Sequence, residues 1–162
     1  MTETGKAVIQ LLTEEKIPFS VYEHEPVYTI EEMLQVGLPD PDAIAKNLFV
    51  RDDKKKNYYL LVIREEKHAD LKQIQQTIGS RRLSFASESD LLAILGLQRG
   101  GVTPFGVLND TDHRVHVYLD ASFFGEQIGV HPNENIATVF LAADDLVALL
   151  RRHGAIVDPI HV

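Results

Sequence analysis

The chain has 162 residues, of which 44% are hydrophobic and 25% charged, as expected for one globular domain with a single hydrophobic core. Its formal net charge of −8 argues against broad, sequence-independent binding of nucleic acid, although RNA could still be contacted over a small local patch. The absence of cysteine excludes disulfides, thiolate metal sites and a cysteine nucleophile.

The first predicted elements are a helix, a strand and a second helix. Apolar residues recur at helical spacing over residues 3–16, and Pro18 ends that helix because proline disfavours helix in the residue before it. Residues 19–23 read as a short strand. A second helix is predicted up to residue 36, with Thr29 as its N-cap and a glycine directly after it.

A β-hairpin is the clearest element of the middle region. Residues 47–51 and 58–63 are predicted strands, and the connecting residues 52–57 carry the charges of the hairpin tip. The second strand is apolar on both faces, so we expect it at the centre of a sheet.

Helical and strand patterns alternate irregularly after the hairpin. Asp70 is the predicted cap of a helix that runs through Ile78, and residues 87–90 open another helix. The apolar side of that second helix would consist of Leu91, Leu92, Ile94 and Leu95. The remaining expected elements are strands over residues 115–119 and 136–141 and a helix over residues 144–153.

This order of elements lacks a regular βαβ repeat and predicts the α+β class, with a mixed, largely antiparallel sheet and flanking helices. No linker or internal repeat divides the chain, so residues 1–162 are expected to form a single domain. The N-terminus does not resemble a signal peptide, and no apolar run approaches the roughly 20 residues of a membrane span. We therefore expect a soluble cytoplasmic protein without membrane attachment.

Lys46 is the first candidate for a chemical role. Strand geometry places it on the same face as the apolar residues Leu48 and Val50, with Asn47 and Phe49 on the other face. Such a lysine could hold its ammonium in a cleft, against a phosphate or a reacting carbonyl. The residue pattern alone favours the alternative, a lysine whose charged end extends from a strand start into solvent.

Two glycine-bearing loops are further candidates. Residues 100–106 form a loop or broken strand whose glycines allow exposed N–H groups to hold an anion, although the segment could be a plain turn. His131 stands in the sequence Gly-Val-His-Pro of residues 129–132. It could orient a substrate or transfer protons there, or it could be an ordinary solvent-exposed loop histidine.

Other catalytic classes find no support in the sequence. The seven histidines are scattered, and His113 and His116 would point to opposite faces of a strand, so no metal site is expected. No nucleotide-binding glycine motif and no serine nucleophile motif is present, and no cofactor is expected.

Three segments together, in order and spacing, resemble the YbaK and prolyl-tRNA-synthetase editing-domain superfamily: residues 45–49 (AKNLF), 100–104 (GGVTP) and 129–132 (GVHP). The resemblance extends from about Phe19 to His153 and is greatest to the freestanding alanyl-tRNA(Pro) deacylases, also called PrdX or ProXp-ala. It implies a mixed α/β sheet with flanking helices, and hydrolysis of the ester between alanine and the 3′ end of proline tRNA.

The resemblance also implies roles for individual residues. The lysine that matches Lys46 is needed for activity in the family, the loop that matches residues 100–104 shapes the pocket, and the histidine that matches His131 contributes to alanine selectivity. We therefore assign catalytic roles to Lys46 and to the backbone N–H groups around Gly101. The predicted substrate-binding residues are Asn47, Gly100, Thr103, Pro104, Phe105 and His131.

The resemblance leaves several functions open. The expected partner is the acceptor end of an aminoacyl-tRNA, with prolyl-tRNA synthetase as a second candidate. The attacking water could be activated by the ribose hydroxyl of the substrate, which would explain why no obvious general base is present. An editing enzyme for cysteinyl-, seryl- or threonyl-tRNA and a non-catalytic module that holds aminoacyl-tRNA or a synthetase are the alternatives.

Overall fold

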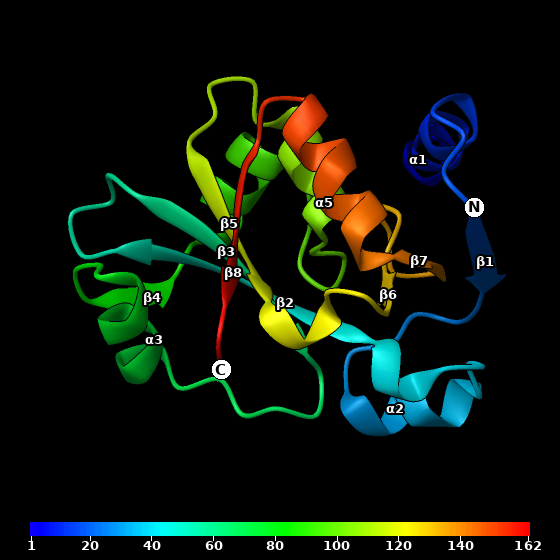
Figure 1. Ribbon diagram of the computed structural model, residues 1–162, viewed down its shortest axis with the longest axis horizontal. Coiled ribbons are helices and arrows are strands. Elements are labelled where there is room, and N and C mark those ends of the chain that lie inside the picture. Colours follow the sequence, from blue (N-terminus) through cyan, green and yellow to red (C-terminus); the bar gives the residue numbers. More distant parts are fainter.

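Two β-sheets, rather than the single predicted sheet, form the centre of the molecule (Figure 1). The computed structural model describes the backbone of residues 1–162 and all side chains except that of Ile30. The larger sheet has the strand order β4-β2-β3-β5-β8 and the smaller sheet the order β1-β7-β6. The strands are β1 (Phe19–Glu23), β2 (Ala45–Asp52), β3 (Tyr58–Arg64), β4 (Leu83–Phe85), β5 (Val115–Asp120), β6 (Gln127–Val130), β7 (Ala137–Ala142) and β8 (Ile156–Ile160).

Most strand pairs are antiparallel, which confirms the predicted fold class. Strand β2 pairs antiparallel with β3 and β4, and all pairs of the smaller sheet are antiparallel. Only β3–β5 and β5–β8 are parallel among the described strand pairs. The strand that was expected at the centre, β3, is the middle strand of the larger sheet.

The helices begin and end close to the predicted residues. They are α1 (Glu3–Glu14), α2 (Ile30–Val36), α3 (Leu71–Ile78), α4 (Glu88–Asp90) and α5 (Ala143–Arg152). The Thr29 side chain accepts a hydrogen bond from the N–H of Glu32, and the Asp70 side chain caps α3 in the same way. Gly37 and Gly79 end these two helices in the left-handed conformation that glycine adopts without strain.

The structure corrects the prediction for the region 87–109. The helix that Ser87 caps is α-helical only over α4 and continues as a π-helix over residues 91–95. Leu92, predicted to face the core, is 58% exposed, whereas the other three leucine and isoleucine residues of that segment are buried. Pro104 does not interrupt a strand but begins a 3₁₀-helix, Pro104–Asn109, with Thr103 as its cap.

Three hydrophobic clusters hold the layers together. The main core gathers side chains of both sheets, α1 and α5, while a second cluster fills the space between α3 and the other face of the larger sheet. The third cluster joins α2 to the smaller sheet through Met33, Ile44 and Phe140. At Gly129 the two sheets come close, because a Cβ atom there would lie 2.9 Å from the Ile44 side chain.

Candidate functional site

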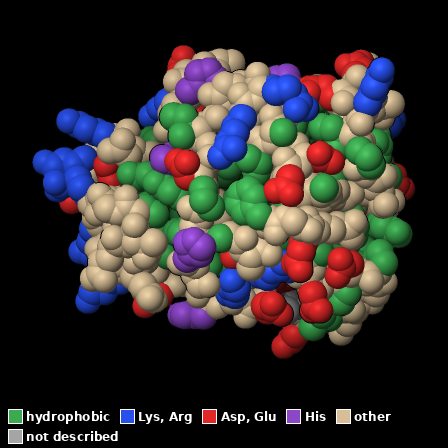
Figure 2. Space-filling model, viewed as in Figure 1, with side chains coloured by type: hydrophobic (Ala, Val, Ile, Leu, Met, Phe, Trp, Pro, Cys, Tyr) green, Lys and Arg blue, Asp and Glu red, His purple; other side chains and the backbone are tan. Residues whose placement is uncertain are grey.

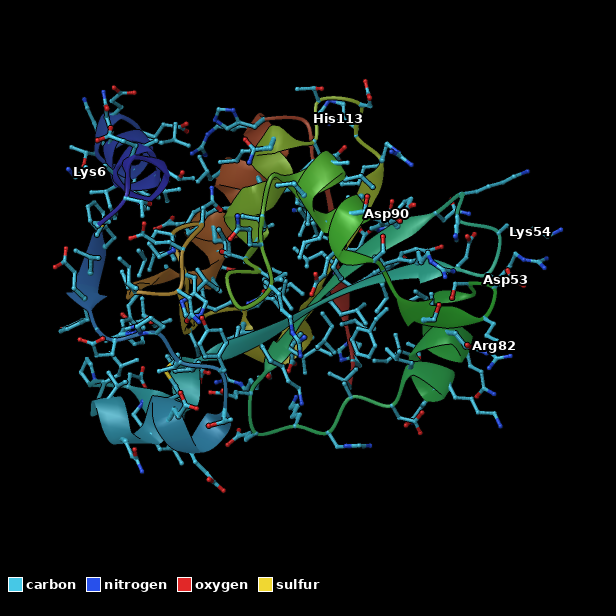
Figure 3. All side chains as sticks on the ribbon, turned by 180° about the vertical axis from the view of Figure 1, so that it is seen from behind. Lys6, Asp53, Lys54, Arg82, Asp90 and His113 are labelled. Atoms are coloured by element: carbon cyan, nitrogen blue, oxygen red, sulfur yellow. The ribbon has the colours of Figure 1, made fainter. Side chains whose placement is uncertain are left out.

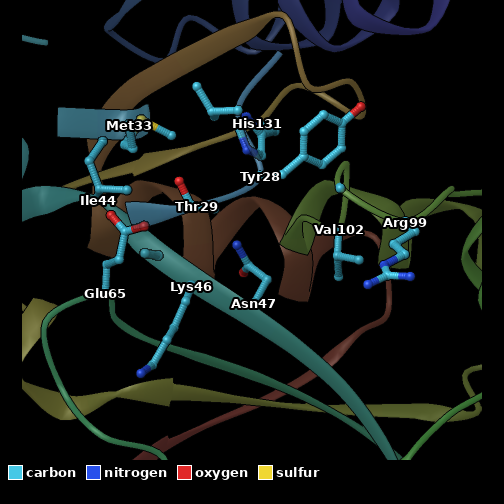
Figure 4. Close-up of a pocket in the computed structure, with 13 residues that line it drawn as sticks. Tyr28, Thr29, Met33, Ile44, Lys46, Asn47, Glu65, Arg99, Val102 and His131 are labelled. Carbon is cyan, nitrogen blue, oxygen red and sulfur yellow. The ribbon is translucent and has the colours of Figure 1, made fainter. Parts of the chain in front are cut away.

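A cavity of about 720 Å³ lies where the start of β2 meets four other segments. Figure 4 shows the side chains around it, which come from the stretch before and within α2, from the residue after β3, from the glycine loop after residue 98 and from the loop after β6. The lining residues are Val27, Tyr28, Thr29, Met33, Ile44, Ala45, Lys46, Asn47, Glu65, Arg99, Gly100, Val102 and His131. Four predicted site residues, Lys46, Asn47, Gly100 and His131, are thus brought together from three distant segments.

Lys46 lines the cavity, but its ammonium is held at one side of it. The Nζ atom donates a hydrogen bond to the backbone carbonyl of Lys67, and Figure 4 shows it directed away from His131 and Tyr28. Burial raises the pKa of the neighbouring Glu65 carboxyl group, while the positive charge of Lys46 acts in the opposite direction. Leu48 and Val50, the two residues predicted to share a strand face with Lys46, both belong to the second hydrophobic cluster.

Asn47 points from the opposite face of β2 into the cavity. Its Oδ1 atom is buried and has no hydrogen-bond partner among the described residues. In Figure 4 the amide nitrogen is directed toward the side of the cavity that holds His131. The unpaired Oδ1 can accept a hydrogen bond from a ligand, and the Nδ2 group of the same amide can donate to a bound carbonyl group.

The glycine loop contributes backbone rather than side chains. Gly100 has a φ of +88°, and a Cβ atom there would lie 2.7 Å from the Tyr28 ring, so glycine allows the ring to pack on the loop. The N–H of Gly101 donates to the Gln98 carbonyl at 3.0 Å and is therefore not free to bind an oxyanion. The N–H groups of Gly100 and Val102 form no hydrogen bond with the described residues and are the better candidates in this loop.

Four predicted residues of this loop lie outside the cavity. Gly101 lines a neighbouring cavity, and Thr103, Pro104 and Phe105 are buried in the protein. Thr103 Oγ1 donates a hydrogen bond to the backbone carbonyl of His131 at 2.5 Å, which joins the two loops. These three side chains therefore support the site from behind and do not reach a ligand in the cavity.

His131 borders the cavity with a neutral ring. Its Nδ1 atom donates to the Ala137 carbonyl at 2.9 Å, because a carbonyl oxygen can only accept, and Nε2 is then left as an acceptor. Burial lowers the pKa of His131, the bond to Ala137 partly offsets this, and the His24 ring, with its centroid 6.2 Å away, lowers the pKa further. The ring is therefore uncharged at neutral pH.

The sequence did not reveal the wall of the cavity that precedes α2. Asn135 holds this wall: its Nδ2 donates to the Val27 carbonyl at 2.6 Å and its Oδ1 accepts from the Val27 N–H at 3.3 Å. Tyr28 is 70% exposed beside the cavity, and the side chain of Arg99 is 87% exposed. Isolated exposed residues such as these form no hydrophobic period, so the sequence offered no reason to place them at the site. Only the position of Arg99 beside the glycine pair could have suggested that Arg99 lies there.

The structure gives no sign of a metal centre or a membrane-spanning segment in its described part. No group of three or more histidine, aspartate or glutamate side chains is close enough to hold a metal ion among the described residues. None of the described helices combines the length and the apolar character that crossing a membrane requires.

Comparisons with known proteins agree on one family. The family model of the aminoacyl-tRNA editing domain matches residues 24–149. The prolyl-tRNA editing protein ProX of Acetoanaerobium sticklandii is 47% identical over 153 residues, which cover 94% of this chain and 93% of ProX. The mouse prolyl-tRNA synthetase associated domain-containing protein 1 is 36% identical over 145 residues, with 86% of this chain and 84% of that protein covered.

Solved structures share the fold. The crystal structure of a candidate trans-editing enzyme for prolyl tRNA synthetase superimposes with a TM-score of 0.75 at 21% identity, and covers 100% of this chain and 99% of that one. The identity is low, so this match establishes the common architecture of two sheets and flanking helices and nothing about the substrate.

Proposed function

Because the chain belongs to the family of aminoacyl-tRNA editing domains and is an aminoacyl-tRNA hydrolase, we propose that it removes alanine wrongly attached to proline tRNA. The observation that carries this proposal is the convergence of Lys46, Asn47, Gly100 and His131 on one cavity. ProX, which shares nearly half of its residues with this chain, is by name an editing protein for prolyl-tRNA. We place the chain in the same role, as a freestanding enzyme that corrects errors of prolyl-tRNA synthetase.

The need for such an enzyme follows from the energetics of side-chain selection. A pocket built for proline cannot strongly reject the smaller alanine, since each missing methylene is worth only about 1–3 kcal/mol of binding. A second pocket that admits only the smaller side chain solves this problem. Here the apolar residues Val27, Met33 and Ile44 and the neutral ring of His131 form a wall suited to a methyl group.

The reaction requires positioning more than strong acid or base catalysis. Water attacks the ester carbonyl carbon, the bond from that carbon to the ribose oxygen breaks, and the ribose oxygen takes up a proton. The developing oxyanion can be stabilised by the Asn47 amide and by the free N–H groups of Gly100 and Val102, with the charge of Lys46 nearby. The neighbouring ribose hydroxyl of the substrate activates the water, and no cofactor is required.

The partner on this proposal is the acceptor end of proline tRNA. The net charge of −8 means that phosphate contacts must be local, and Lys46 and Arg99 are two cations at the cavity. Prolyl-tRNA synthetase would supply the mischarged tRNA, either by release into solution or by direct transfer.

A hydrolysis panel tests the proposal. Proline tRNA charged with alanine, cysteine, serine or proline is incubated with the protein, and the remaining ester is measured over time. We expect alanyl-tRNA(Pro) to lose its alanine fastest and prolyl-tRNA(Pro) to persist. Preference for cysteine or serine would assign a different substrate to the same fold, and threonyl-tRNA extends the panel in that case. Loss of none of the esters would indicate a binding module.

A further inference from the structure

A second cavity of about 420 Å³ adjoins the first, and Tyr28 and Arg99 line both. Its other walls come from the start of α1, the π-helix and the turn after it, and the loop 133–136. Its volume is in the range of small-molecule sites. The chemistry of ester hydrolysis, as described above, leaves this cavity without a role.

Two large apolar side chains beside this cavity are left in solvent. Tyr28 is 70% exposed and Leu92 is 58% exposed, although Leu92 belongs to a segment whose other large apolar residues are buried. Single exposed apolar residues are common on protein surfaces, but two that border the same cavity suit a flat apolar ligand. An aromatic ring next to a cavity is the usual stacking partner of a nucleobase.

The polar groups of the cavity suit the edge of a base. Gln98 is exposed, and Asn133 lines the cavity from the left-handed region at a φ of +61°, with a buried Oδ1 that has no partner among the described residues. Amides offer a donor and an acceptor side by side, which is how proteins pair with base edges. Arg99 makes only a 4.0 Å contact with the Glu88 carboxylate, so its guanidinium can turn to a phosphate.

We propose that the second cavity binds the adenine base of the 3′-terminal nucleotide of tRNA, while the aminoacyl ester of that nucleotide occupies the first cavity. This inference rests on the proposed function. The ester and the base are attached to the same ribose, so they need two adjoining spaces with a common wall. In this arrangement the Tyr28 ring stacks on the base, Leu92 contacts it from the cavity wall, and Arg99 contacts the phosphate that precedes it.

The test uses minihelices of the proline tRNA acceptor stem charged with alanine. They end in adenosine, in purine riboside, which lacks the 6-amino group, or in an abasic ribose. We expect the wild-type kcat/KM to fall roughly tenfold for the purine end and by about 100-fold for the abasic end. Replacement of the penultimate cytidine by uridine should change kcat/KM little.

Two variants connect these losses to the cavity. Tyr28→Ala should lower kcat/KM roughly tenfold on the adenosine-ended minihelix and much less on the abasic one, whereas Tyr28→Phe, which keeps the ring, should lose much less than Tyr28→Ala on the adenosine-ended minihelix. Leu92→Ala should behave like Tyr28→Ala to a smaller degree. Ile156→Ala is the matched control, since Ile156 is a 51% exposed aliphatic residue on β8 that lines neither cavity.

Different outcomes separate this inference from the proposed function. Equal hydrolysis of all three ends by the wild type would overturn the base subsite and leave the deacylase intact. Sensitivity to the penultimate base in place of the terminal one, or unchanged discrimination in Tyr28→Ala and Leu92→Ala, would also overturn it. Failure of the wild type to hydrolyse any charged minihelix and any full-length alanyl-tRNA(Pro) would overturn both proposals together.

Discussion

Lys46 combines a position in the cavity with an ammonium that is already bound to the Lys67 carbonyl. This contact holds the ammonium at one side of the cavity without neutralising its charge. We expect Lys46→Ala to lower kcat/KM for alanyl-tRNA(Pro) by about 100-fold, the usual effect of losing one electrostatic contact to a transition state. Lys54→Ala at the hairpin tip, shown in Figure 3, removes the same charge far from the cavity and should retain activity. A wild-type rate in Lys46→Ala would contradict the assignment.

Gly100 and Gly125 allow conformational strain to be separated from loss of the site. Both have positive φ, +88° and +82°, but a Cβ atom meets the Tyr28 ring at Gly100 and nothing within 4 Å at Gly125. Alanine should therefore destabilise the fold by about 1–2 kcal/mol at either position. Only Gly100→Ala should also lower deacylation, by tenfold or more, as measured beside urea unfolding. Equal activity of the two variants would show that the Tyr28–Gly100 contact has no role.

The lowered pKa of His131 predicts how stability depends on pH. The folded protein binds a proton at this ring less readily than the unfolded chain, whose histidine has a pKa of 6.5. The stability from the neutral ring is therefore complete above about pH 6.5 and is lost as the pH falls toward the folded value. Between pH 7.5 and 5.5 the free energy of unfolding should decrease less in His131→Asn than in the wild type. Urea titrations at both pH values measure this, and His161→Asn at the exposed C-terminus is the control.

The sequence allowed only part of the site to be predicted, for a physical reason. Lys46, Asn47, Gly100 and His131 stand in segments whose residue pattern is unusual, and these four line the cavity. Residues 103–105 stand in the same segments but point into the protein, since the 3₁₀-helix turns them inward. Only the structure shows which residues of a conspicuous loop face the ligand.

At the scale of elements, local sequence signals predicted where the helices begin and end but did not predict the edge strands of the larger sheet. The caps Thr29 and Asp70 and the glycines after α2 and α3 gave the helix ends correctly. Strand β8 was missed because it contains Pro159, which argues against a strand in the middle of a sheet, but β8 is an edge strand where proline is tolerated. The three-residue strand β4 is too short for any periodicity to be seen.

The segment before α2 depends on one side chain of another loop. Asn135 forms two hydrogen bonds with the backbone of Val27 and thereby acts like a neighbouring strand for the residues that include Tyr28. Asn135→Ala should free this segment and lower kcat/KM by about tenfold, with faster amide hydrogen exchange over residues 24–29.

Asn109→Ala is the matched control for this prediction. The Asn109 amide donates to the Leu95 carbonyl at 2.9 Å, so the variant also loses a side-chain to backbone hydrogen bond, but one at the end of the π-helix. It should lower stability by about 1 kcal/mol and leave exchange over residues 24–29 unchanged. If both variants accelerated amide exchange over residues 24–29 equally, the cause would be a general loss of stability and not the loss of the Asn135–Val27 hydrogen bonds.

At the scale of the whole molecule, charged side chains of one sign gather in two places on the face shown in Figure 2. Figure 2 shows basic side chains at the tip of the β2–β3 hairpin and acidic side chains around the end that holds α2. The acidic end lies beside the cavity, which restricts favourable approach of a phosphate chain to the side of Lys46 and Arg99. Because such phosphate contacts are few, the tRNA can be released after its ester has been hydrolysed.

A hydrogen-bond network around the buried residues Arg64 and Asp120 links the larger sheet to the segment before β6. Arg64 is the last residue of β3, and its side chain donates to the backbone carbonyls of Asp42 and Ser122 and to the carboxylate of Glu126, which precedes β6. Asp120 at the end of β5 accepts from the Arg64 N–H and from Lys67 Nζ at 3.0 Å. Since the Lys67 carbonyl accepts a hydrogen bond from Lys46, this network connects the architecture to the residue that we propose as catalytic.

Asp120 therefore predicts the acid sensitivity of the whole fold. Burial alone would raise the pKa of its carboxyl group, but hydrogen bonds from Ser122, Arg64 and Lys67 outweigh burial and hold the pKa below the usual 3.8. A lowered folded pKa means that the stabilisation is present above about pH 3.8 and is lost as the pH falls through the folded value.

Asp120→Asn should lower the free energy of unfolding by about 3 kcal/mol at pH 7, because it leaves buried donors poorly paired. The difference from the wild type should shrink as the pH falls from about 5 toward 2, as measured by urea unfolding. The exposed Asp112→Asn, which removes one charge from a surface turn, should show no such change, and a difference for Asp120→Asn that stayed constant with pH would refute the ionic role of this network.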